Sequence, residues 1–486
     1  MIDYPDDSSD NKTAGRSPMT ISPTFCAFPF THLVIHNSGT YGPCCGASEH
    51  FFVDDNNKVE SDKMFDSTKS TAIKPYGLGI KEAFNSEPME HIRQELLKGN
   101  KPSACASCWK QEKNKVITSK RQENNDLYFA LRPEFKGIFD YEPSKISINP
   151  HIRSLDLKFS NKCNLHCLMC STGNSDMWMP LDEKINQYLI KRNLKRDTKS
   201  GNVLEWNDEK NDTNLYHSTD HQVKNSEQFY NRVGSFPQHL FEEIKSLIPQ
   251  LREIQCTGGE PFVSKQFIEL LKYAIDTGHA EHIALEITTN GTKFVTDVME
   301  LLIHFRHVRF LVSVDGAGST YEYIRAPFKY SMLLERLTVL SDYMAAGKIN
   351  AMVDISAVAM SYNLFDYYNL NEVAGVFTTL GTDNKNNGRF NNLSLTLYNA
   401  DSPLHIKWLP DELLDTALNF YTRRDVIWEQ LKSYVDTNRV DQETKLHNQR
   451  RMKNYTVLMD KMLNRDYHDF LDPRIVEFLD TIESDL

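Results

Sequence analysis

The stretch SNKCNLHCLMC (160–170) places Cys163, Cys167 and Cys170 in a C-x3-C-x2-C spacing, directly after SLDLKFS (154–160), which alternates like a β-strand. Thiolates are soft ligands that favour iron–sulfur clusters or zinc. A closed zinc site needs a fourth protein ligand. His166 lies between two of the cysteines, where it is hard to aim at the same ion, so we interpret it as structural. Three cysteines suit a cubane 4Fe–4S cluster whose fourth iron stays open to a small molecule.

Beyond this stretch, strand-like and helix-like segments alternate along the chain. The later predicted strands are 252–258, 282–290, 308–316, 350–360 and 392–398. Helical patterns fill most of the gaps, as at 265–278 and 330–347. This order is typical of a parallel α/β architecture. Six such units predict a partial (β/α)6 TIM-like barrel, with its chemistry at the C-terminal ends of the strands.

The rest of the chain divides by composition and pattern. The predicted parts are a disordered N-terminus (1–22), a compact Cys-bearing domain (23–120), a connector (121–150), the core barrel (151–400) and a mainly helical C-terminal extension (401–486). The Cys-bearing domain contains a predicted strand at 32–36, a turn at 37–40 and a helix at 89–99. Residues 172–235 form a polar insertion, either a lid over a substrate or a disordered segment.

Composition narrows the class of protein. The 486 residues are 40% hydrophobic and 25% charged, as in an ordinary globular protein with a sizeable core. The net charge of -11 argues against broad, sequence-independent nucleic-acid binding, which relies on surplus Lys and Arg. No apolar stretch is long enough to span a membrane, and the acidic N-terminus does not resemble a secretory signal. We therefore predict a cytoplasmic protein, in which clustered cysteines indicate metal binding more than disulfides.

A second group of cysteines lies in FCAFPF (25–30), GPCCGAS (42–48) and PSACASCWKQE (102–112). Cys105 and Cys108 form a C-x2-C half-site, which Cys26 and either Cys44 or Cys45 would complete. Four thiolates suit a zinc or rubredoxin-like site, or a fully ligated 4Fe–4S cluster. Consecutive side chains of an extended segment point to opposite sides, so only one of the adjacent pair should face a metal, and we favour Cys44.

The first cysteine cluster resembles that of the radical SAM superfamily. The resemblance implies that the open iron binds S-adenosylmethionine (SAM), which a low-potential electron splits into methionine and a 5′-deoxyadenosyl radical. It also implies an electron donor such as flavodoxin or ferredoxin. CTGGEPF (256–262) is similar to the family's GGEP segment, in which Gly258 and Gly259 allow close approach and Glu260 receives the SAM amino group.

Further strand ends fit the same resemblance. Thr289, Asn290, Ser313 and Asp315, in TTNGT and SVDG, are implied to reach the ribose and methionine parts of SAM. Arg325 in YEYIRAP resembles an arginine that pairs with the SAM carboxylate, and a surface salt bridge is its alternative. Ala357 and Val358, on the fifth predicted strand, would pack against the adenine of SAM. The alternative is that they only form part of the hydrophobic core. Met169 departs from the family, which often has an aromatic residue there.

The second cysteine group resembles a SPASM/twitch auxiliary-cluster domain, here before the barrel although most such domains follow it. The resemblance implies a second 4Fe–4S cluster on Cys26, Cys44, Cys105 and Cys108. Enzymes of this type often modify peptides or proteins, so we predict such a substrate. The alternatives are a dehydrogenase or epimerase of a sugar or nucleoside derivative, and a non-catalytic iron–sulfur or zinc protein. No catalytic residue is assigned, although Tyr398 and Cys256 are conceivable hydrogen donors.

Overall fold

The chain is described as a computed structural model. It covers residues 22–54, 58–62, 73–74, 76–114, 119–131, 139–142, 145–148, 150–192, 195–197, 203–205, 235–377, 389–397, 402–421, 426–437 and 440–486. The described residues of 1–159 and 235–255 form one compact unit, and those of 160–234 and 256–486 form another. Residues 1–21 of the predicted disordered N-terminus lie outside the described residues, as does Tyr398.

The sheet of the first unit has the strand order β11-β8-β1-β2-β3-β4, and β5 also pairs with β3. These strands are β1 (His32–Ile35), β2 (Tyr41–Gly42), β3 (His50–Asp54), β4 (Val59–Asp62), β5 (Ile73–Lys74), β8 (Ser154–Leu157) and β11 (Glu253–Cys256). β1 pairs with β8 in parallel and with β2 antiparallel. Gly39, with φ of 82°, makes the predicted turn between β1 and β2. All four residues of β1 are buried, as expected of an inner parallel strand.

Helices and a separate ribbon complete the first unit. They are α1 (Phe28–Thr31), α2 (Ile80–Phe84), α3 (Glu87–Leu97), α4 (Ala106–Asn114), α5 (Lys120–Leu131), α8 (Gln238–Leu247) and the ribbon of β6 (Phe139–Glu142) with β7 (Lys145–Ile148). α3 buries Met89, Ile92 and Leu96 and is followed by Gly99 with φ of 82°, the stop signal seen in the sequence. The predicted connector therefore contains regular structure, namely α5, β6 and β7.

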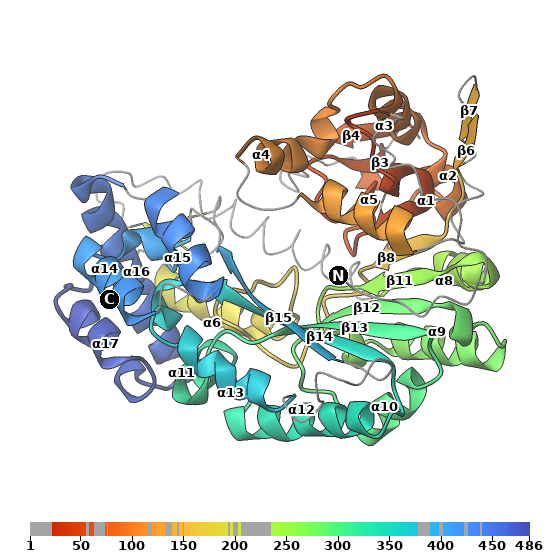
Figure 1. Cartoon of the computed structure of the whole chain (residues 1–486). Coiled ribbons are helices and arrows are strands. Elements are labelled where there is room, and N and C mark those ends of the chain that lie inside the picture. The colour runs from red at the N-terminus through yellow and green to blue at the C-terminus, as the bar shows by residue number, and fades with distance from the viewer. Residues whose placement is uncertain are drawn as a thin grey trace. The chain divides into compact units, whose positions relative to one another are not determined.

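The second unit contains four parallel strands, in the order β12-β13-β14-β15 (Figure 1). They are β12 (Ala284–Thr289), β13 (His307–Ser313), β14 (Ala351–Ala359) and β15 (Arg389–Leu397). All three neighbouring pairs are parallel, which confirms the α/β class with a mostly parallel sheet. The intervening helices are α9 (Lys265–Asp276), α10 (Thr296–Leu302), α11 (Gly318–Ile324), α12 (Tyr330–Ala345) and α13 (Leu370–Gly375). Parallel strands bring their carboxyl ends to one edge, where loops can build a site.

The second unit also includes the described residues of the C-terminal stretch and those of the polar insertion up to residue 234. The insertion contributes α6 (Trp178–Ile190), β9 (Lys195–Asp197) and β10 (Val203–Glu205), and the C-terminal stretch contributes α14 (Asp411–Phe420), α15 (Val426–Thr437), α16 (Gln442–Leu463) and α17 (Pro473–Asp480). α16 lies against α6 and buries Met452, Tyr455 and Met459. Among the helices described, none is long and apolar enough to cross a lipid bilayer.

Candidate active site

The loop that carries Cys163, Cys167 and Cys170 is held in shape by the residues that follow it. The Asp176 carboxylate accepts the Cys163 amide at 2.9 Å and the Lys162 ammonium at 2.8 Å. The Ser175 hydroxyl donates to the Leu165 carbonyl at 2.6 Å. Because these bonds fix the backbone between the cysteines, the loop does not depend on a bound group for all of its shape.

Two aromatic side chains extend this support from helices. The indole N–H of Trp178, at the start of α6, donates to the Cys167 carbonyl at 3.0 Å. The hydroxyl of Tyr455, on α16, donates to the Leu168 carbonyl at 2.7 Å. Sequence reasoning did not single out Asp176, Trp178 or Tyr455. The position of Asp176 close behind the cysteines was a usable signal, whereas nothing local marked Tyr455.

The three thiols are shielded from water and share polar neighbours. Burial raises the pKa of all three, that of Cys170 to about 11. The Asn290 amide lies 3.8 Å from the Cys163 sulfur, and the Arg325 guanidinium lies 3.9 Å from the Cys167 sulfur. A metal ligand must lose its proton, so insertion of a cluster would release protons, and these donors would then face thiolates.

His166, interpreted from the sequence as structural, is half-buried. Its backbone amide donates to the Ala326 carbonyl at 2.9 Å. Burial, and secondarily Arg465, lower the pKa of its imidazole. These features agree with a structural histidine.

The Gly258–Gly259–Glu260 segment lies directly against the cysteine loop. Both glycines have positive φ, 80° and 55°. A Cβ atom on Gly259 would come within 2.2 Å of the Lys162 carbonyl oxygen. The Glu260 amide donates to that same oxygen at 2.8 Å. Only glycine allows this approach, which ties the two predicted motifs into one structure.

Glu260 is a buried carboxylate with several donors around it. It is 1% exposed and accepts from the Thr289 hydroxyl at 2.9 Å, the Asn290 amide at 2.8 Å and the Phe262 amide at 3.2 Å. Burial raises its pKa to about 7, although these hydrogen bonds pull the other way. A cation placed beside it would favour the charged form.

Arg325 and Asp315 form a buried ion pair, not the surface salt bridge that was the alternative for Arg325. Their closest atoms, Nε and Oδ2, are 2.6 Å apart, and the side chains are 8% and 0% exposed. The other Asp315 oxygen accepts the Val358 amide at 2.7 Å. Burial opposes the charge of Arg325, but Asp315 and Cys167 outweigh it and raise the pKa of the guanidinium.

The remaining candidate residues lie on the strands β11, β13 and β14. Ser313 ends β13 and is half-buried, and Ala357 of β14 is fully buried. Cys256 is 1% exposed at the end of β11, in agreement with a buried strand residue.

Tyr321, on α11, was not singled out from the sequence. Its side chain is 0% exposed, and its hydroxyl has no hydrogen-bond partner among the described residues. Burial raises the pKa of this hydroxyl, and Arg325 follows one helical turn later, its amide donating to the Tyr321 carbonyl at 2.8 Å. An unpaired buried hydroxyl costs about 1–3 kcal/mol. The site therefore fits a bound polar group that would accept this hydrogen bond.

The second cysteine group also converges. Cys26, Cys44, Cys105 and Cys108 line one pocket of the first unit, whereas Cys45 is exposed and does not. Burial raises the pKa of all four thiols. Within the described part of the chain, no three His, Cys, Asp or Glu side chains converge tightly enough for a single metal ion. Four thiols can ligate either an iron–sulfur cluster or zinc, so the donor set fits both.

A family profile matches the part of the chain that contains this site. Residues 157–354 match the sequence profile of the Radical SAM superfamily, so the chain carries a domain of that superfamily. This stretch includes the three-cysteine loop, Glu260, Arg325 and Asp315. No curated protein matches the chain significantly.

Several solved structures are similar at low sequence identity. They include anSMEcpe with bound AdoMet (16% identity, 59% of this chain and 63% of that chain, TM-score 0.31), SuiB from Streptococcus suis bound to precursor peptide SuiA (12%, 80% and 68%, 0.28) and TYW1 with a lysine-pyruvate adduct (12%, 65% and 82%, 0.25). The chain thus covers less than two thirds of anSMEcpe.

Proposed function

We propose that this chain is a radical SAM enzyme that abstracts hydrogen from a peptide or protein substrate. The observation that carries the proposal is the contact between the three-cysteine loop and the Gly259–Glu260 segment, beside the buried Arg325–Asp315 pair. A 4Fe–4S cluster with SAM on its open iron would supply reductive cleavage of SAM to a 5′-deoxyadenosyl radical.

The residues of the chain would bind and orient this cofactor pair. Cys163, Cys167 and Cys170 would hold the cluster. Glu260 would accept the SAM ammonium, and Arg325 would pair with the SAM carboxylate while Asp315 fixes its side chain. Gly258, Thr289, Asn290 and Ser313 would complete the walls of the SAM site. The burial of these groups excludes water, which strengthens each polar contact.

The peptide or protein substrate rests on the resemblance of residues 23–120 to a SPASM/twitch domain and on the pocket formed by four cysteines. That pocket would hold a second 4Fe–4S cluster. A dehydrogenase or epimerase of a sugar or nucleoside derivative is the second candidate, and a non-catalytic iron–sulfur protein is the third. Flavodoxin or ferredoxin is the proposed electron donor, and the cytoplasm is the proposed location.

The test of SAM cleavage is anaerobic reconstitution with iron and sulfide, addition of SAM and a strong reductant, and mass spectrometry of 5′-deoxyadenosine. We expect production that the Cys163→Ala variant lacks. Equal production by Cys163→Ala would contradict the assignment of the first cluster. Zinc in place of iron in the purified protein would exclude the mechanism.

The substrate class needs a separate measurement. Peptides encoded beside the gene would be incubated with the reconstituted enzyme, and their masses compared with those after incubation with Cys163→Ala. A mass change only with the active enzyme would support a peptide substrate. Product from a sugar or nucleoside derivative, with every peptide unchanged, would favour the second candidate.

A further inference from the structure

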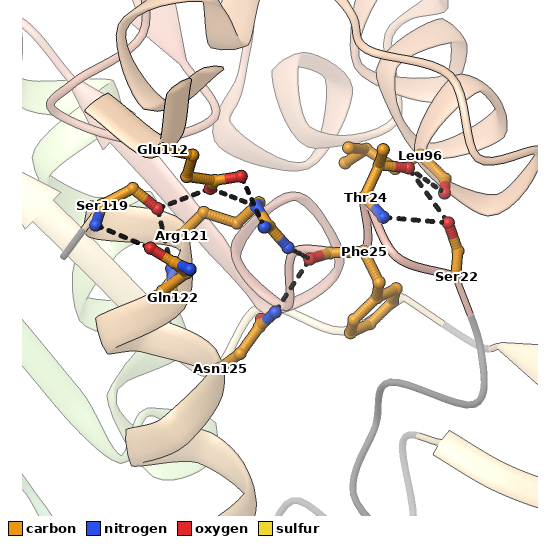
Figure 2. Close-up of polar contacts among 9 residues, drawn as sticks. All are labelled: Ser22, Thr24, Phe25, Leu96, Glu112, Ser119, Arg121, Gln122 and Asn125. Carbon is orange, nitrogen blue, oxygen red and sulfur yellow. Dashed lines mark hydrogen bonds and ion pairs between the residues drawn. The ribbon is translucent and has the colours of Figure 1, made fainter. Parts of the chain in front are cut away.

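Arg121 lines the four-cysteine pocket. Three hydrogen bonds hold its guanidinium in place (Figure 2). Its Nε and Nη2 donate to the two carboxylate oxygens of Glu112, each at 2.8 Å. Its Nη1 donates to the Phe25 carbonyl at 2.8 Å. The bidentate geometry fixes the plane of the guanidinium as well as its position.

The neighbours of Arg121 are themselves anchored. The Ser119 hydroxyl donates to Glu112 at 2.6 Å, and the Asn125 amide donates to the same Phe25 carbonyl at 2.8 Å. The guanidinium carbon lies 5.2 Å from the centre of the Trp109 ring, within range of a cation–π contact. The Arg121 side chain is only 10% exposed, so water screens its charge little.

The charge acts on the thiols of the pocket. Burial dominates the pKa values of Cys26, Cys105 and Cys108 and raises them, and Arg121 acts in the opposite direction on all three. The amides of Lys120 and Arg121, at the start of α5, also hydrogen-bond the Cys108 sulfur. The negative charge of Glu112 raises the pKa of Cys108. Glu112 therefore helps the pocket only by holding the Arg121 guanidinium in place. Arg121 therefore offsets part of the cost of placing negative charge on these buried sulfurs.

We propose that the positive charge of Arg121 makes the cluster of the four-cysteine pocket easier to reduce. Adding an electron to a thiolate-ligated cluster adds negative charge, and a fixed guanidinium stabilises that charge. The inference rests on the proposed function only for the presence of this cluster. A purely structural role, in which Arg121 merely ties α4 and α5 to the segment around Phe25, would leave the potential unchanged.

The test is a redox titration followed by electron paramagnetic resonance. It uses the full chain carrying Cys163→Ala, in which the second cluster gives the remaining signal. Arg121→Gln should lower the ratio of reduced to oxidised cluster roughly tenfold at a fixed potential, which is 59 mV for one electron. Glu112→Gln should shift the potential upward, because the charge of Arg121 is then unbalanced. Arg474→Gln is the matched control, since Arg474 makes the same bidentate pair with Asp472, each bond 2.8 Å, and does not line the pocket.

Opposite shifts in Arg121→Gln and Glu112→Gln, with none in Arg474→Gln, would support the proposal. A wild-type potential in both variants would overturn it. If Arg121→Gln loses its iron, the double variant Arg121→Gln/Glu112→Gln, which leaves no unpaired carboxylate, is compared with Glu112→Gln. A lower potential in the double variant would support the proposal, and an equal potential would overturn it. Zinc, or no metal, in the parent protein would overturn the proposal whether or not SAM is cleaved. Failure of SAM cleavage with the second cluster present would leave it intact.

Discussion

At the scale of single residues, Glu260 is the group whose protonation matters most. Its burial raises its pKa to about 7, so near neutral pH it is divided between the two forms. The unfolded chain would ionise this carboxyl at lower pH, near the ordinary value of 4.5. The unfolded state therefore binds fewer protons between about pH 4.5 and 7, and this residue makes the fold less stable as pH rises through that range.

Binding of SAM should have the opposite dependence on pH. A protonated Glu260 offers the SAM ammonium no charge, and its pKa is about 7 in the free protein. We expect SAM affinity to fall as pH drops below 7, by up to about tenfold per unit. Equilibrium binding to the cluster-loaded protein between pH 6 and 8.5 would measure this. A Glu260→Gln variant should bind SAM weakly at every pH, and a flat wild-type profile would refute the role of Glu260.

The unpaired hydroxyl of Tyr321 gives a second prediction at this scale. If bound SAM accepts its hydrogen bond, Tyr321→Phe removes about 0.5–1.5 kcal/mol of binding. That corresponds to a roughly two- to tenfold higher Kd for SAM. Tyr343→Phe is the control, because its hydroxyl bonds Glu300 at the surface. Equal affinities in the two variants would mean that Tyr321 only packs.

At the scale of elements, the contact between the glycine segment and the cysteine loop is the most restrictive feature. Gly259 and Gly278 both have positive φ, 55° and 73°. A Cβ on Gly278 would meet nothing within 4 Å, whereas on Gly259 it would collide with the Lys162 carbonyl. Alanine at Gly278 would therefore cause backbone strain alone, whereas alanine at Gly259 would cause backbone strain and a steric clash.

We expect Gly278→Ala to destabilise the protein by about 1 kcal/mol, the usual cost of a left-handed alanine. Gly259→Ala should cost more and lose the iron of the first cluster, because the loop must move. Thermal unfolding and iron content would test this. Normal iron content in Gly259→Ala would show that the loop tolerates the displacement.

At the scale of the whole molecule, the two cysteine groups lie in separate compact units. Loss of one site should therefore spare the other. Cys105→Ala should remove about half of the iron and abolish product formation, yet still produce 5′-deoxyadenosine. Iron analysis and the SAM-cleavage assay would test this. Loss of SAM cleavage in Cys105→Ala would instead show that the second cluster supplies the first with electrons.

The sequence by itself determined the parallel α/β class, the core strands and the residues of the three-cysteine loop. These features depend on short-range periodicity and on chemically distinctive residues, which can be recognised without knowing what they contact. Alternation along an extended segment predicted that only one of Cys44 and Cys45 faces the metal, and we favoured Cys44. Of the two, Cys44 lines the pocket, although the residues lie in a bend and a turn and not in a strand. The sequence left open whether Arg325 is buried or forms a salt bridge at the surface, because burial of an ion pair depends on which segments pack around it.

Only the tertiary structure decided which distant residues complete the sites. Tyr455 supports the cysteine loop through a hydrogen bond that spans 287 residues of the chain. Arg121 reaches the Phe25 carbonyl across 96 residues. Tyr321 lies one turn before Arg325 on α11, but its complete burial comes only from the packing of this helix. No local pattern marks such residues, because a tyrosine or arginine on a helix acquires its role from the packing of other segments against it.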